Sequence, residues 1–68
     1  MLGTVKWYNE LRGFGFIIPD GGGKDVYVHA TALGRIGMVP IKDGERVSFE
    51  TAPDKYGRGL QAINVKRT

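Results

Sequence analysis

Cysteine is absent from this sequence of 68 residues, and histidine occurs only once. Without cysteine the chain forms no disulfide and no thiolate metal site, and a single histidine is too few for the usual zinc clusters. No apolar run approaches the ~20 residues of a membrane-spanning helix, and no signal peptide precedes the first strand-like segment. We therefore expect one cytoplasmic domain over residues 1–68, with no cofactor, no metal and no membrane contact.

Acidic residues are outnumbered by basic ones, with seven aspartates and glutamates against ten lysines and arginines. The net charge of +3 and the isoelectric point of about 9.5 favour a polyanionic partner without identifying one. The position of each charge is therefore more informative than the sum.

Long helical stretches are also lacking, because eleven glycines and three prolines interrupt the chain. The apolar residues mostly follow a two-residue period, which is typical of β-strands. Strands are predicted at residues 4–8, 13–18, 25–29, 46–50 and 60–65. Residues 19–23 have the composition of a turn, residues 31–33 of one helical turn, and residues 34–41 and 52–59 of loops.

Five short strands in so small a chain predict a closed barrel, since an open sheet leaves apolar surface and strand edges in water. Barrels of this size include the oligonucleotide-binding (OB) architecture and the SH3-like architecture. Strand number alone does not separate the two.

The predicted strands have two apolar faces, and only one of them forms the core. The aliphatic set consists of Val5, Ile17, Val26, Val28, Val47 and Phe49. The ring-bearing set consists of Phe14, Phe16, Tyr27 and His29. If the rings were inside, Ile17, Val26 and Val28 would point into water, so we expect the aliphatic set inside and the rings on the surface. Glycine at positions 13 and 15 fits the inner face of a tight barrel.

Exposed aromatic rings on adjacent strands predict a binding surface. Cationic residues flank them in the sequence, namely Lys6, Arg12, Lys24, Lys55 and Arg58. Unpaired bases stack on rings while cations contact phosphates, and each stacked base contributes about 1–3 kcal/mol. Three or four stacked bases predict dissociation constants of about micromolar to nanomolar. Duplex DNA hides its base faces and is a poor ligand for such a surface.

The same residues resemble the bacterial cold-shock protein family, the cold-shock domain. Residues 12–17 (RGFGFI) are similar to the first ribonucleoprotein motif of that family, usually KGFGFI, and residues 25–29 (DVYVH) to the second. Residues 3–9 (GTVKWYN) and 43–49 (DGERVSF) match two further family segments, and residues 59–65 resemble its last strand. The resemblance covers nearly the whole chain.

The resemblance implies an all-β, five-stranded antiparallel OB-fold barrel rather than an SH3-like one. It implies a monomer that binds single-stranded RNA and DNA, preferably pyrimidine-rich, as an RNA chaperone or a regulator of transcription or translation. The stacking residues of the family fall on Trp7, Phe14, Phe16, Tyr27 and His29, and its basic contacts on Lys6, Arg12 and Arg58. Lys6 and Trp7 are neighbours, so both face the ligand only if the first strand bends or bulges there.

This chain departs from the family pattern at three positions. Ala30 and Met38 stand where the family usually has phenylalanine, and Leu60 stands where it often has proline. Met38 still packs against a base, but one lost ring costs about tenfold or more in affinity. We therefore predict a shorter or weaker site than the family norm.

Other interpretations of these residues are weaker. A barrel that receives a Pro-rich or extended peptide on its rings predicts acidic rather than basic surroundings. A nuclease needs a carboxylate cluster, and a metal or base role for His29 needs a second ligand beside it. Residues 21–24 (GGGK) precede a strand, whereas a phosphate-binding loop leads into a helix. No small-molecule substrate is expected.

Overall fold

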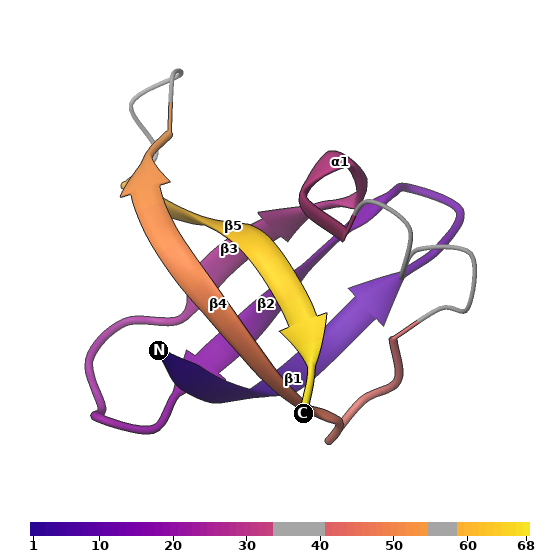
Figure 1. Cartoon of the computed structure of the whole chain (residues 1–68). Helices are drawn as coiled ribbons and strands as arrows, with labels where there is room; N and C mark the ends of the chain where they lie inside the picture. Colours follow the sequence, from indigo (N-terminus) through magenta and orange to yellow (C-terminus); the bar gives the residue numbers. More distant parts are fainter. Residues whose placement is uncertain (34–40, 55–58) are drawn as a thin grey trace.

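The computed structural model is a closed barrel of five strands with one short helix (Figure 1). It describes residues 1–33, 41–54 and 59–68. The elements are β1 (Leu2–Asn9), β2 (Phe14–Pro19), β3 (Val26–His29), α1 (Ala30–Leu33), β4 (Arg46–Pro53) and β5 (Leu60–Arg67). Around the barrel the strands follow the order β1-β2-β3-β5-β4, and β1 pairs with β4 to close it. The all-β OB-fold barrel expected from the sequence is confirmed.

One pairing departs from the antiparallel arrangement, because β3 and β5 run parallel. The other four pairings are antiparallel. An odd number of strands in a closed ring cannot alternate in direction throughout, so one parallel pair is a consequence of closing five strands. That parallel pair is short, with a single register partner, Tyr27 opposite Gln61.

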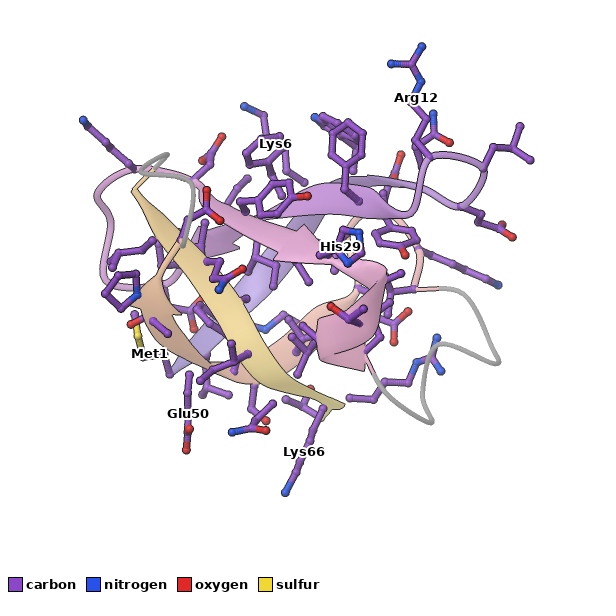
Figure 2. The ribbon with its side chains drawn as sticks, turned by 90° about the horizontal axis from the view of Figure 1, so that it is seen from above. Met1, Lys6, Arg12, His29, Glu50 and Lys66 are labelled. Atoms are coloured by element: carbon purple, nitrogen blue, oxygen red, sulfur yellow. The ribbon has the colours of Figure 1, made fainter. Side chains whose placement is uncertain are left out.

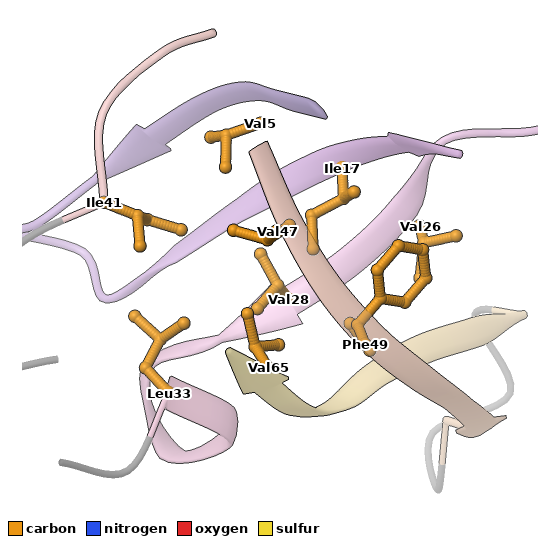
Figure 3. Packing of buried hydrophobic residues seen from close by; sticks show 10 residues of the cluster. Val5, Ile17, Val26, Val28, Leu33, Ile41, Val47, Phe49 and Val65 are labelled. Carbon is orange, nitrogen blue, oxygen red and sulfur yellow. The ribbon is translucent and has the colours of Figure 1, made fainter. Parts of the chain in front are cut away.

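The core is the aliphatic face predicted from the sequence (Figure 3). All six predicted residues are buried, and the described residues add Leu33, Ile41, Ala62 and Val65. Val5, Ile17, Val28 and Val47 are the largest side chains that are fully buried. Removing one buried branched aliphatic side chain costs about 2–5 kcal/mol, so this small set carries much of the stability.

The strand boundaries differ modestly from those predicted. β4 continues to Pro53 and β5 to Arg67, both beyond the predicted ends. β2 begins at Phe14 rather than Gly13, because Gly13 has a positive φ of 73° and lies in the preceding turn. Gly13 is therefore needed for its backbone conformation, whereas Gly15 lies on the inner face as expected.

Two bulges bend the strands so that the barrel can close. In β1 the register with β2 shifts between Val5 and Trp7. In the β4–β5 pair it shifts between Ser48 and Glu50, opposite Asn64, whose φ is 51°. Asparagine tolerates this left-handed conformation better than most residues, and its Nδ2 donates to Glu50 Oε2 at 3.0 Å.

Two ion pairs join strand ends across the closure. Arg46 binds the carboxylate of Asp20 through both terminal nitrogens at 2.6 Å, and it donates to Thr4 Oγ1 at 2.9 Å. The Arg67 guanidinium, at the last residue of β5, pairs with Glu45, which immediately precedes β4. Hydrogen bonds from these arginines hold the pKa values of both carboxyls below their usual range. Among the helices described, none is long and apolar enough to cross a membrane.

Candidate functional site

Four aromatic rings from three strands gather on the outer face of the barrel. The ring centroid of Trp7 lies 5.5 Å from that of Phe14 and 5.3 Å from that of Phe16, and both pairs are edge-on. Tyr27 lies 5.9 Å from Phe14, in a stacked arrangement, and 5.9 Å from Phe16, edge-on. These are favourable aromatic pair geometries. We call this set, Trp7, Phe14, Phe16 and Tyr27, the ring cluster.

The strand registers explain why the rings meet. Trp7 lies opposite Phe16 in the β1–β2 pair, and Phe16 lies opposite Tyr27 in the β2–β3 pair. Side chains that alternate with them point inward, so Ile17 is fully buried while Phe16 is only half-buried. Trp7 keeps 36% of its surface exposed, and the ring cluster therefore presents aromatic surface to a ligand.

The β1 bulge lets two consecutive side chains face outward. Val5 is buried, so in a regular strand Trp7 would also point into the core. The register shift inserts Lys6 as an extra residue between them, and both Lys6 and Trp7 are exposed. The bulge expected at this point of the first strand is present.

Gly15 allows β1 to lie close to β2 behind the ring cluster. A Cβ atom at this position would lie 2.3 Å from the carbonyl oxygen of Trp7 and 2.8 Å from the Cα of Tyr8. Both neighbours are backbone atoms that cannot move without separating the strands. The alternation of phenylalanine and glycine in residues 14–16 therefore has a geometric cause.

Lys6 and Arg12 project along the same side of the molecule (Figure 2). Lys6 Nζ lies 2.8 Å from Asp25 Oδ2, and both side chains are substantially exposed, at 50% and 34%. Arg12 belongs to the β1–β2 turn, where its backbone N–H donates to Asn9 Oδ1 at 3.1 Å. The sequence did not reveal the partnership of Lys6 with Asp25, because it depends on the bulge and on the register across β2.

His29 lies opposite Phe14 at the end of β3 and is exposed. Its Nδ1 atom lies 3.0 Å from Thr31 Oγ1 and accepts the backbone N–H of Thr31 at 3.2 Å. Two nearby carboxylates in the sequence, Asp20 and Asp25, form ion pairs with Arg46 and Lys6. Among the residues that the structure describes, no three potential metal ligands gather.

Hollows adjoin the ring cluster on two sides. One of about 450 Å³ is lined by Phe16, Tyr27, Lys24 and Leu60, among others. The second, of about 500 Å³, lies between Trp7, the β1–β2 turn and Asp43. Residues of the ring cluster thus line both hollows, Trp7 the second and Phe16 and Tyr27 the first.

Several predicted contacts fall outside the described residues. Met38 and Arg58 are among them, as is Lys55. Of the departures from the family pattern, Ala30 is exposed beside His29, and Leu60 is 53% exposed at the start of β5.

Tyr8 packs against the core. Its burial is the main cause that raises the pKa of its hydroxyl, and the charge of Glu10 adds to the increase.

Comparison with known proteins identifies the family of this barrel. The family described as "'Cold-shock' DNA-binding domain" matches residues 1–68, which is the whole chain. The chain belongs to the cold-shock domain family. This is a nucleic-acid-binding family and not an enzyme family, and the resemblance found in the motifs is thereby confirmed.

Individual relatives cover almost the same length as this cold-shock domain. A probable cold shock protein y4cH of Sinorhizobium fredii is 45% identical over 64 residues, or 94% of this chain and 93% of the relative. The cold shock-like protein CspA of Stigmatella aurantiaca is 47% identical, with 94% and 91% covered. The cold shock-like protein CspE of Escherichia coli is 46% identical over 63 residues, with 93% and 88% covered.

Proposed function

We propose that this cold-shock domain binds single-stranded RNA and DNA by stacking unpaired bases on the ring cluster and His29. The observation that carries the proposal is the exposed aromatic surface formed by three adjacent strands, with cations beside it. Stacking supplies about 1–3 kcal/mol per base, and it requires base faces that a duplex does not offer. The surface is therefore selective for single strands.

Lys6 and Arg12 supply the phosphate contacts in this proposal. Arg12 extends from the β1–β2 turn on the same side of the molecule as Lys6, the neighbour of Trp7 (Figure 2). Lys6 pairs with Asp25, so a phosphate competes with that carboxylate for the ammonium group. Exposed ion pairs contribute only about 0–1 kcal/mol, and such a pair opens readily for a ligand. Met38 and Arg58 complete the proposed contacts.

The cellular role proposed here is that of an RNA chaperone or a regulator of transcription or translation. Weak, stacking-based binding suits such a role, because it holds RNA unpaired without requiring one sequence. A mild preference for pyrimidine-rich strands, a monomeric state and a cytoplasmic location belong to the same proposal. No catalytic step is part of it.

A peptide-binding function is the alternative for the same surface. Rings in a groove also receive Pro-rich segments, but that mode gains little from flanking cations. Lys6 is exposed next to Trp7, and Arg12 projects on the same side of the molecule, which favours a polyanion instead.

A fluorescence titration of Trp7 tests the proposal against this alternative. Short oligo-dT is expected to quench the tryptophan, whereas the matching duplex is not. Raising the salt concentration is expected to weaken binding with a slope of log K against log salt of about −2 to −3, as for three or four phosphate contacts on a single strand. Absence of quenching, or equal binding of the duplex, would contradict base stacking. Binding that salt does not affect would favour a peptide ligand.

A further inference from the structure

The ring of His29 is held from one side by Thr31. The backbone N–H of Thr31 points at Nδ1 over 3.2 Å, and its hydroxyl oxygen lies 3.0 Å from the same nitrogen. A backbone N–H only donates, so Nδ1 accepts and carries no proton in the neutral ring. With Nδ1 unprotonated, the Thr31 hydroxyl is the only one of the two groups that can donate in this second contact. The proton of the neutral imidazole is consequently on Nε2.

The other ring nitrogen, Nε2, is available to a ligand. Among residues 1–33, 41–54 and 59–68 no hydrogen bond involves it, and the residue is exposed. The next residue, Ala30, is exposed and small. At the position where the family usually has a phenylalanine ring, this chain therefore has only a methyl group, next in sequence to His29.

We propose that Thr31 is a positioning residue that fixes His29 as an Nε2–H donor to an oxygen atom of the bound strand. Stacking uses the face of the imidazole, whereas the N–H lies in its plane, so the ring stacks one base and donates to an atom beside it. The acceptor is either a base carbonyl or a phosphate oxygen. This inference rests on the proposed function, and it gives the site a directional contact in place of the ring lost at Ala30.

The first test needs no ligand. The ¹⁵N chemical shifts of the His29 ring in the free protein report which nitrogen carries the proton. We expect an unprotonated Nδ1 and a protonated Nε2. Thr31→Val removes the hydroxyl and keeps the backbone N–H. It is therefore expected to leave most of the proton on Nε2 while raising the share of the other tautomer, and Thr31→Ser is expected to restore the original signature. A proton on Nδ1 in the unchanged protein would overturn the role of Thr31, and an unchanged signature in Thr31→Val would overturn the part played by its hydroxyl.

The second test measures the donor by binding. His29→Phe keeps an aromatic face and removes the N–H, and its affinities for oligo-dT and oligo-dA are compared with those of the unchanged protein by Trp7 fluorescence. Loss of one hydrogen bond is expected to weaken binding about two- to tenfold. Thr31→Val is expected to shift affinity in the same direction, and Thr31→Ser to leave it unchanged.

The two oligonucleotides separate the possible acceptors. A loss confined to oligo-dT assigns the hydrogen bond to a base carbonyl, because adenine has none. An equal loss with both excludes an acceptor found only on thymine and fits phosphate, which the two strands share. If His29→Phe loses no affinity for either oligonucleotide, the donor role of His29 is refuted, while base stacking is unaffected. Failure of the unchanged protein to bind either strand would defeat the proposed function itself, and the ¹⁵N signature would still report on Thr31.

Discussion

Arg12 shows how little a single side chain reveals about its role without its surroundings. In the sequence it is one of ten basic residues, and the net charge of +3 does not distinguish them. In the structure it lies on the β1–β2 turn and projects on the same side as Lys6, the neighbour of Trp7, whereas Lys66 points from the opposite side of the barrel (Figure 2). Position relative to the rings, rather than charge alone, makes Arg12 a candidate phosphate contact.

This contrast gives a matched pair of variants. Arg12→Gln is expected to weaken binding to oligo-dT at low salt and to reduce the steepness of the salt dependence by about 0.7, the contribution of one phosphate on a single strand. Lys66→Gln removes the same charge on the far side and is expected to change neither quantity. Titrations at several salt concentrations measure both. Equal effects of the two variants would mean that net charge, and not a local contact, governs binding.

Phe16 contacts both Trp7 and Tyr27 in the ring cluster, and it lies opposite both of them in the strand registers. Phe16→Ala is expected to reduce affinity for oligo-dT by about tenfold or more, since one stacking platform contributes about 1–3 kcal/mol. The salt slope is expected to stay unchanged, because no phosphate contact is lost. Fluorescence titration measures both, after circular dichroism has shown that the variant is folded. An unaltered affinity would exclude Phe16 as a platform.

At the scale of elements, the β1–β2 pair determines the shape of the site. The bulge at Lys6 turns Trp7 outward, and Gly15 lets the two strands approach behind it. Both features lie in the same strand pair, so the geometry that pairs β1 with β2 also positions the rings on the surface. A change that separates the strands is therefore expected to affect stability and binding together.

Gly15→Ala tests that link. The new Cβ would lie 2.3 Å from a backbone oxygen, so we expect a loss of stability of at least about 1–3 kcal/mol, the usual cost of overpacking. The midpoint of thermal unfolding falls by about 4–8 °C for each kcal/mol in a domain of this size. Gly21→Ala is the control, because a Cβ there meets nothing within 4 Å. Equal midpoints for the two variants would show that the close approach is dispensable.

At the scale of the whole molecule, the ion pairs of Asp20 with Arg46 and Glu45 with Arg67 couple stability to pH. Hydrogen bonds from the arginines lower the pKa of each carboxyl in the folded state. A lowered folded pKa means that the stabilisation is complete above the unfolded values of about 3.9 and 4.3. It is lost as the pH falls through the lower folded values.

Urea unfolding at neutral and acidic pH tests whether stability falls as the pH is lowered. The unchanged protein is expected to lose stability as the pH falls below about 4. The double variant Asp20→Asn, Glu45→Gln is expected to be less stable at neutral pH and to show a flatter pH dependence. Parallel pH profiles for the two proteins would place the acid sensitivity in other carboxyls.

The small core and the many glycines also limit stability as a whole. Ten buried hydrophobic residues are found in the described parts, while eleven glycines raise the entropy lost on folding. We expect a thermal midpoint below about 65 °C, measured by circular dichroism or calorimetry. A midpoint well above this value would mean that the ion pairs and the barrel closure contribute more than expected.

The sequence by itself determined the strands, their two faces and the identity of the rings. These properties follow from the two-residue alternation of a strand, which is local, and the motif match with the cold-shock family extended them to a fold. Trp7 was placed by the motif, and the bulge that its exposure needs was inferred from its neighbour Lys6. The burial of Val26 and Val28 followed from alternation alone.

Only the tertiary structure decided which residues meet across the barrel. The sequence did not predict the ion pair of Lys6 with Asp25 or the parallel β3–β5 pairing. It also did not predict that Leu33 and Ile41 are buried in the core, or that Thr31 donates a hydrogen bond to His29. Each depends on strand register, on ring closure or on the path of the chain after β3. These are non-local quantities, set by how all the strands fit together at once, and no short stretch of sequence encodes them.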